Sequence, residues 1–182
     1  MGVSVTNLLQ GPAVISTGAF GAVEPANTAT ALGSTWTDIG GTDGGCRLVM
    51  SQTYSAMMVD QIAQRVGSRK VDQNFAVATA MAEATLKNLR AALNVADPGA
   101  ETNTLGVKAE ITNADPLYRA ICIEGQRPGG GPRRIYIRRA LSTENIEMAF
   151  TKDGKTLIPV TFTSHYVSAS IDSIFIDDRP GP

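Results

Sequence analysis

Residues 127–140 read Arg-Pro-Gly-Gly-Gly-Pro-Arg-Arg-Ile-Tyr-Ile-Arg-Arg-Ala, and the two parts of this stretch decide the fold class. The first six residues form a turn sequence, because proline fixes φ and glycine adopts positive φ without steric cost. In the next eight, two isoleucines alternate with Arg134, Tyr136 and Arg138, which is the period of a β-strand. The stretch therefore predicts a hairpin tip followed by a strand, with these three larger side chains on an exposed face that contacts another subunit.

Segments of the same kind extend along most of the chain. The sequence predicts strands at Pro12–Phe20, Thr35–Ile39, Val107–Ile111, Tyr118–Glu124, Arg133–Ala140, Ile146–Phe150, Lys155–Thr163 and Ser170–Asp177. Clusters of Gly, Pro, Asn and Asp at 40–45, 113–116, 127–132 and 152–155 are typical of turns, and Asp-Gly at 153–154 is a favoured hairpin turn. Many short strands with one helix indicate a mainly β (α+β) fold, a β-sandwich or barrel of antiparallel strands.

A second hairpin is unusually apolar. Cys46–Ser51 and Tyr54–Ile62 have the composition of its strands, with Gln52 and Thr53 near the tip, and the whole loop covers about 44–65. Apolar side chains lie on more than one face, and a two-stranded ribbon alone cannot bury them. A second molecule could. We therefore assign a subunit-interface role to Leu48, Met50, Tyr54, Met57, Met58 and Val59.

Residues 75–94 are open to two interpretations. Their Ala, Met, Glu and Leu content favours a single long helix by intrinsic propensity. The first half, however, alternates larger residues with alanines at every second position, which is the period of a strand. Leucines at helical spacing follow, with Thr85 as the candidate N-cap and Pro98 as the stop. We expect a strand and then a short helix at about 85–94.

Length and composition indicate one domain, residues 1–182, with an N-terminal arm at 1–10. Charged residues make up 18% of the chain, below the roughly 25% of ordinary globular proteins, which suggests that identical neighbours cover much of the surface. The net charge of −1 gives no positive field to collect phosphates, so tight DNA binding is disfavoured. The chain matches no export signal and has no membrane span, and we expect it to be soluble.

Candidate catalytic groups are few and dispersed. His165 is the only histidine, and its neighbour Ser164 would point to the opposite face of a strand. The triple glycine at 129–131 lacks the Gly-Lys ending and the following helix of a phosphate-binding loop. Glutamates occur at positions 83, 110, 124, 144 and 147, on separate elements, so none pairs with another as general acid and base.

Metal and disulfide sites are equally poorly supported. Asp172, Asp177 and Asp178 do not have the spacing of a calcium loop. Cys46 and Cys122 lack a CxxC spacing and a nearby histidine, so we expect both to be reduced and buried. The sequence predicts no catalytic residue, no metal and no cofactor.

Several stretches resemble a known family. Trp36-Thr37-Asp38-Ile39-Gly40, then Asp43-Gly44-Gly45, Val71-Asp72-Gln73 and the run 81–93 with Glu-Ala-Thr-Leu-Lys-Asn-Leu, resemble the major tail tube proteins of long-tailed (siphovirus-like) bacteriophages, of the actinophage type. Ile158-Pro159-Val160-Thr161-Phe162 is similar to the penultimate strand of that family. Together these stretches cover roughly residue 36 to the C-terminus.

The resemblance implies a β-sandwich flanked by one helix and assembled into six-membered rings, which stack into a hollow tube in the virion tail. Assembly would occur in the host bacterial cytoplasm. The implied partners are further copies of the chain and the tape measure, tail terminator and tip proteins, with no membrane. The hairpin and the N-terminal arm resemble the stacking loop and arm of the family. DNA would pass through the channel without specific binding, so we expect Arg134 and Arg138 at subunit contacts or outside the channel.

Two other classes of function remain open. One is a tube subunit of a contractile injection or type VI secretion-like machine, which has the same architecture. The other is a monomeric β-sandwich that binds carbohydrate or protein. A binding module of that kind should show an aromatic platform, whereas the one Trp, four Tyr and five Phe of this chain are scattered.

Overall fold

The computed structural model describes residues 4, 7–9, 11–97, 103–107 and 115–180, which form eight strands and one short helix. In chain order the elements are β1 (Val14–Ala19), β2 (Trp36–Asp38), β3 (Thr42–Val59), β4 (Ile62–Met81), α1 (Leu86–Ala92), β5 (Arg119–Gln126), β6 (Pro132–Ser142), β7 (Ile158–Ser164) and β8 (Ile174–Asp177). The strands form one sheet in the order β2-β1-β5-β6-β7-β4-β3, with β8 beside β6, and all pairs are antiparallel. The prediction of a mainly β, antiparallel fold with one flanking helix is confirmed.

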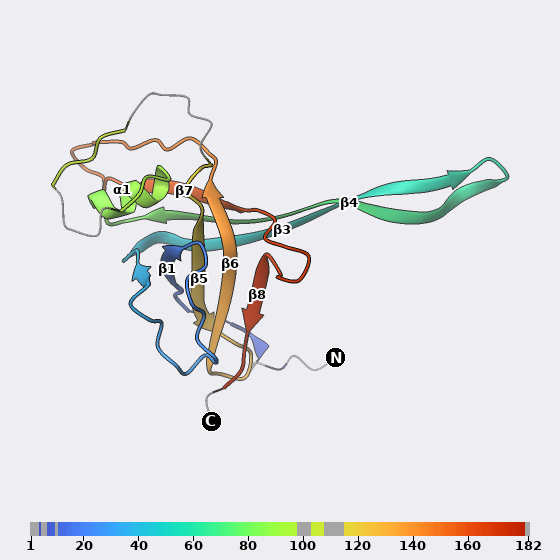
Figure 1. Cartoon of the computed structure of the whole chain (residues 1–182), viewed down its shortest axis with the longest axis horizontal. Coiled ribbons are helices and arrows are strands. Elements are labelled where there is room, and N and C mark those ends of the chain that lie inside the picture. Colours follow the sequence, from blue (N-terminus) through green and yellow to red (C-terminus); the bar gives the residue numbers. More distant parts are fainter. Residues whose placement is uncertain (1–3, 5–6, 10, 98–102, 108–114, 181–182) are drawn as a thin grey trace.

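The single sheet folds over on itself at β6. The first part of this strand pairs with β8, from Arg134 to Ile137, whereas its end pairs with β7, from Ala140 to Ser142. A strand that changes neighbours in this way makes the corner between two packed layers. As a result β3, β4 and β7 run across β1, β5 and β6, and Figure 1 shows these two layers.

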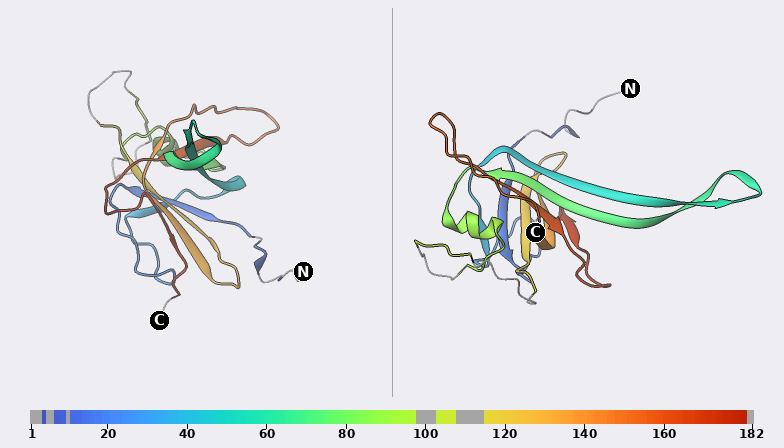
Figure 2. Two further views of the ribbon diagram at one scale, coloured as in Figure 1. Left: turned by 90° about the vertical axis from the view of Figure 1, so that its right-hand side faces the viewer. Right: turned by 90° about the horizontal axis from the view of Figure 1, so that it is seen from above.

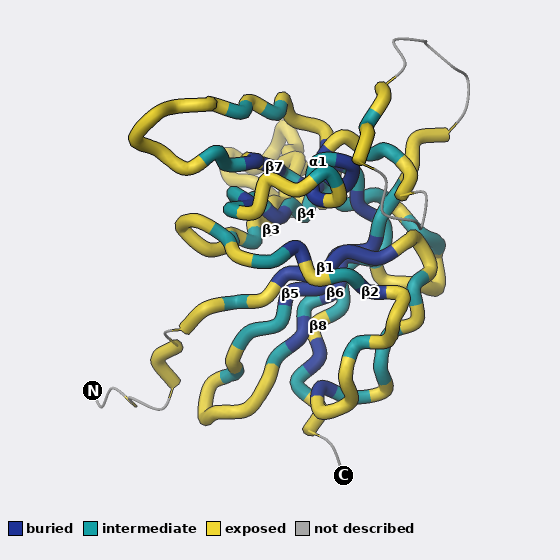
Figure 3. The backbone as a smooth tube through the Cα atoms, turned by 90° about the vertical axis from the view of Figure 1, so that its left-hand side faces the viewer, coloured by how far each residue is buried: buried dark blue, intermediate teal, exposed yellow. Residues whose placement is uncertain are grey.

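The main core lies between the two layers. It contains buried side chains from β1, β4, β5, β6, β7 and α1, among them Ile15, Val77, Met81, Ile121, Ile137 and Phe162. A second, smaller cluster of Trp36, Ala120, Cys122 and Tyr136 occupies the opposite face of the β5–β6 pair. Figure 3 shows the buried backbone concentrated in these layers and exposed backbone in the loops around them.

The region 75–94 is a strand followed by a helix, so this prediction is confirmed. β4 extends to Met81, and α1 begins at Leu86 after the N-cap Thr85. The Thr85 hydroxyl accepts a hydrogen bond from the Asn88 backbone N–H at 3.2 Å, which satisfies one of the free donors of the first helical turn.

The glycine cluster at 40–45 is only partly a turn. Gly40, Gly44 and Gly45 have positive φ, as a glycine-rich turn requires. Strand β3 nevertheless begins at Thr42, inside the cluster. The glycines therefore form an irregularity within the β3–β4 ladder, where the register shifts between Asp43 and Cys46.

Some predicted strands are wrong or too long. Ile146–Phe150 was predicted to be a strand but is a loop. Ile146 and Met148 pack against the main core from this loop, and Phe150 is exposed. Asp153-Gly154 consequently lies in a loop and not in a hairpin turn. The last two strands begin only at Ile158 and Ile174, later than expected.

Several sequence predictions lie outside the described residues. They are most of the N-terminal arm at 1–10, residues 108–111 of the expected strand at 107–111, and the start of the turn at 113–116. Glu110 also lies outside the described residues.

Candidate functional site

The longest feature of the molecule is a hairpin arm, which we define as residues 50–75. β4 pairs with β7 only from Ala76 to Met81, whereas residues 62–75 of β4 pair only with β3. The arm therefore projects from the body as a free two-stranded ribbon, as Figures 1 and 2 show. Its base is fixed by the Phe75 backbone N–H, which donates to the Ser164 hydroxyl at 3.3 Å.

The position of the tip differs from the prediction. The sequence suggested a turn at Gln52 and Thr53, but these residues lie within β3 and pair with Gln73 and Asp72. The chain turns at Asp60-Gln61, between the last paired residues Val59 and Ile62. The ribbon is therefore about twice as long as the predicted hairpin.

The arm is apolar and exposed on both faces, as predicted. Successive residues of a strand point to opposite faces, so the apolar side chains spread over both sides of the ribbon, and the ladder is irregular between Met57 and Val59. Phe75, at the base of the arm, is half-buried. The other large apolar side chains of the arm are between 42% and 60% exposed, and they comprise Met50, Tyr54, Met57, Met58, Val59, Ile62, Val66 and Val71. Leu48, at the root of the arm, packs in part against the main core.

Polar contacts along the arm are few. Tyr54 donates from its hydroxyl to Gln52 at 2.6 Å, and Lys70 donates to the side chain of Gln73. The arm is fully described, and none of its charged side chains forms an ion pair. The side chains of the arm form no catalytic cluster. The arm instead exposes a long apolar surface, which is typical of a contact with another molecule.

The face of β6 that carries Arg134, Tyr136 and Arg138 is not exposed, so the predicted exposure of this face is wrong. The predicted contact of these three residues with another subunit stays a prediction. The Arg134 side chain is 5% exposed and pairs with Glu124 at 2.5 Å. It also donates to the carbonyls of Asn27 and Thr30, at 3.1 and 2.6 Å. The guanidinium therefore attaches the loop before β2 to the sheet.

Tyr136 and Arg138 are covered in the same way. Tyr136 is 1% exposed and lies between the rings of Trp36 and Phe175. Arg138 donates two hydrogen bonds to the Glu24 carboxylate, at 2.6 and 2.8 Å, and lies over the Phe175 ring. The side chains that cover them come from positions 24–36 and from β8, far away in the sequence, so the local pattern contained no sign of them.

Burial and ion pairing shift several pKa values in this region. Loss of solvation raises the pKa of Tyr136 and of Cys122, each to about 12. Hydrogen bonds from Arg179 hold the pKa of Asp177 below its ordinary value, and those from Arg133 do the same for Asp178. Both cysteines are free thiols. Cys122 is buried, as expected, whereas Cys46 is only half-buried, which differs from the prediction.

The structure does not bring the candidate catalytic and metal-binding residues together. His165 lies against the Tyr118 ring, and its Nδ1 is 3.1 Å from the Thr163 carbonyl. Among the described residues, no three His, Cys, Asp or Glu side chains gather where they could hold a metal ion. The one described helix is too short to cross a membrane.

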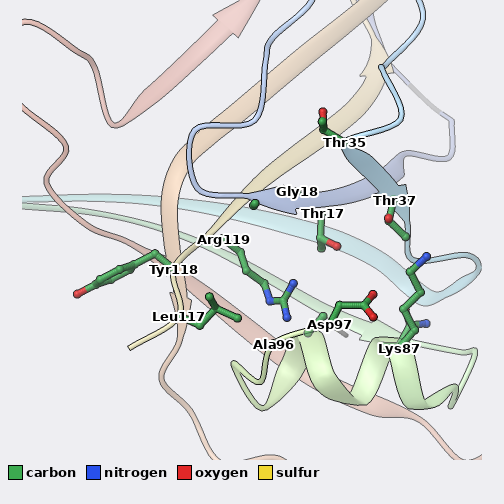
Figure 4. A pocket seen from close by; sticks show the side chains of 13 residues that line it. Thr17, Gly18, Thr35, Thr37, Lys87, Ala96, Asp97, Leu117, Tyr118 and Arg119 are labelled. Carbon is green, nitrogen blue, oxygen red and sulfur yellow. The ribbon is translucent and has the colours of Figure 1, made fainter. Parts of the chain in front are cut away.

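One cavity of about 300 Å³ lies between β1, β2 and α1 (Figure 4). Figure 4 shows Arg119 pointing into it from β5, with Asp97 and Lys87 nearby. Arg119 already donates to the Val95 carbonyl at 2.6 Å. Its main contact therefore stabilises the chain that leaves α1, and the cavity brings together no nucleophile and base.

Two further grooves are more apolar. The first, which we call the core groove, has a volume of about 300 Å³ and lies at the root of the arm between Leu48, Ile123 and Ile135. The second, which we call the loop groove, measures about 520 Å³ and is lined by Phe20, Ile171 and the ion-paired Glu24 and Arg138. Neither groove was predicted, because each is formed by segments distant in sequence.

Comparison with known proteins identifies the family of this chain. A search of curated proteins found no match. The phage tail tube protein family matches residues 7–175 of the 182, which includes the arm and both layers of the sheet. The chain therefore belongs to the phage tail tube protein family, and it is a structural component of the virion tail.

Proposed function

We propose that copies of this chain close into six-membered rings, and that these rings stack into a hollow tube through which DNA passes. The observation that carries the proposal is the arm, a ribbon that pairs with no other strand of the described residues and whose large apolar side chains, apart from Phe75, are 42% to 60% exposed. Such a surface is unusual on a protein that remains monomeric. Contact with a second copy would bury it, as membership of a tail tube family leads one to expect.

The size of the apolar surface suits assembly of many copies better than of two. Burying one large apolar side chain contributes about 1.5–3 kcal/mol. Because the arm's side chains are already about half buried, docking four of them would contribute about 3–6 kcal/mol, against an association cost of about 4–15 kcal/mol. One arm contact alone is therefore marginal, whereas several arms that dock together between two rings reinforce one another.

The edges of the sheet offer the second contact. β2 and β3 lie at the two ends of the strand order, so one side of each backbone has no strand partner among the described residues. Unpaired edges are templates for pairing with another chain. Pairing of one edge with a different edge of the next copy is a head-to-tail contact, and such contacts close into a ring when the rotation from copy to copy adds up to a full turn. The number six comes from the family resemblance.

Passage of DNA requires a channel that does not hold phosphate. Arg134 and Arg138 have carboxylate partners inside the chain, so neither is free to bind phosphate, and the overall charge of −1 provides no net positive field. We include the tape measure, tail terminator and tip proteins as further partners by family resemblance.

Negative-stain electron microscopy of the concentrated protein tests the proposal. Rings or hollow tubes are expected, with a sixfold end-on view. Single small particles at every concentration would instead indicate a monomeric binding module and would refute the proposal.

A further inference from the structure

The core groove is an opening into the main core. Its apolar lining consists of Leu9, Pro12, Ala13, Leu48, Ile123 and Ile135. Ala13, Cys46, Leu48 and Ile135 are only partly buried, yet all four pack against the main core. Apolar side chains that enter the groove would therefore extend the existing core, and water would be excluded from both surfaces at once.

The arm of the same molecule cannot fill this groove. Leu48 lines the groove and is also part of β3, and the β3–β4 ladder continues from there through Met50 and Phe75 towards the tip. A paired ribbon has little freedom to fold back on its own root, and Figure 1 shows the tip at the far end of the molecule from the body. The groove and the tip of one chain are thus at opposite ends of one continuous element.

We propose that the core groove receives the arm tip of a second copy, namely the apolar side chains of Met57, Met58, Val59 and Ile62. The inference rests on the assembly proposed above and adds the receptor for the arm. Because tip and groove lie at opposite ends of the ribbon, each copy donates one tip and accepts another. The contact is head-to-tail and leaves a free tip and a free groove at the ends of every stack, so stacking can continue.

The loop groove is the less suitable receptor. Both Glu24 and Arg138 line it, so an apolar tip placed there would remove a whole ion pair from water, which is costly. The core groove has one charged lining residue, Arg133, whose guanidinium donates two hydrogen bonds to Asp178, each at 2.7 Å. Asp178 is outside the groove lining, so this pair can remain in contact with solvent.

Disulfide trapping tests the assignment with a cysteine that the groove already contains. Cys46 lines the core groove, and the other native cysteine, Cys122, is completely buried. Met58→Cys adds one thiol to the tip while keeping it apolar, and Met57→Cys, Val59→Cys and Ile62→Cys cover the other registers. Assembled protein is oxidised with copper-phenanthroline at pH 9, since burial raises the pKa of the Cys46 thiol, and is then separated on a non-reducing gel.

The expected result is a ladder of covalent oligomers for at least one tip position. Each copy then has one tip thiol and one groove thiol, so chains of any length form. Adding Cys46→Ser should remove the ladder and leave at most dimers, because only tip thiols remain accessible.

A matched variant moves the reporter thiol to the loop groove, as Cys46→Ser together with Ser170→Cys and a tip cysteine. A ladder that forms only in this variant would overturn the assignment. Tubes visible by microscopy without a ladder at any tip position would also overturn it, while leaving the proposed function intact. If the wild-type protein forms no tubes at all, the proposed function fails and the receptor assignment fails with it.

Discussion

At the residue scale, single side chains and glycines position the ribbon that becomes the arm. Gly40 has φ +79° two residues before β3, and the Glu83 carboxylate lies 2.2 Å from the position that a Cβ would take. That carboxylate accepts a hydrogen bond from the Gly41 backbone N–H at 3.1 Å. The start of β3 is thereby tied to the end of β4, and the root of the arm is fixed in the body.

Replacing Gly40 with alanine should destabilise the fold. A side chain in the left-handed region costs about 1–2 kcal/mol, and the new Cβ would also displace Glu83. We expect Gly40→Ala to lower the free energy of unfolding by about 1–2 kcal/mol in urea denaturation. Gly33→Ala is the matched control, since it has open space around it and no positive φ, and it should be neutral or slightly stabilising.

The stability of the monomer should depend on the ionisation of Asp177. Its pKa is held below the ordinary value of 3.8, chiefly by the side-chain hydrogen bonds from Arg179. A carboxyl with a depressed pKa in the folded state stabilises the fold fully above its unfolded pKa, and this contribution declines below that value and is lost as the pH falls through the folded pKa. Asp177→Asn should therefore be less stable than wild type at pH 7, and the difference should shrink at pH 3.

Urea denaturation midpoints at the two pH values measure this effect. Asp153→Asn, an exposed carboxylate in the loop before β7, is the control and should track the wild type at both. A difference for Asp177→Asn that is as large at pH 3 as at pH 7 would show that ionisation of this carboxyl does not stabilise the fold.

At the element scale, the arm is the part with the least internal support. Residues 50–75 pair only with one another, so their packing comes from one neighbouring strand and their apolar side chains remain in water. An isolated two-stranded ribbon is marginally stable. Docking onto another copy would both bury these side chains and stabilise the ribbon.

Placing charge at the arm tip should block assembly without unfolding the monomer. Met57 and Met58 are 58% and 60% exposed, so Met57→Asp with Met58→Asp should change the free energy of unfolding by no more than about 0.5 kcal/mol. Loss of two apolar contacts, together with burial of charge, should raise the concentration needed for assembly at least about a hundredfold. Gln61→Asp with Gln64→Asp adds the same charge at exposed polar positions and is the control.

Light scattering against protein concentration measures this change, and circular dichroism checks the fold. Normal assembly of the Met57→Asp, Met58→Asp variant would mean that the tip does not contribute to the contact. Equal inhibition by the glutamine control would mean that charge alone, and not loss of apolar surface, is responsible.

The elements also show what the sequence can and cannot predict. β2 and the end of β4 were predicted because their side chains alternate between buried and more exposed positions. β1 was predicted from its small and β-branched residues beside a glycine turn, and the structure buries both of its faces. The arm was predicted too short because residues 63–74 face solvent on both sides, so no apolar period indicates that they form a strand. Ile146 and Met148 alternate like a strand but belong to a loop that packs on the core, since the pattern reports burial and not backbone pairing.

At the scale of the whole molecule, one sheet forms both the buried core and the apolar surfaces that remain exposed in a single copy. Folding at β6 buries Ile137 and Phe162 between the layers, and it leaves the edges of β2 and β3, the core groove and the arm outside. The second layer of side chains around Tyr136 could not be predicted, because it depends on loops that return from other parts of the chain. Assembly is then the step in which these outer surfaces become buried.

A cryo-electron microscopy map of the assembled protein tests this view most directly. The account predicts six copies in each ring, with Met57 and Met58 of every arm enclosed by a copy in the adjacent ring. A map in which the arms extend into solvent, or in which rings stack through other surfaces alone, would contradict it.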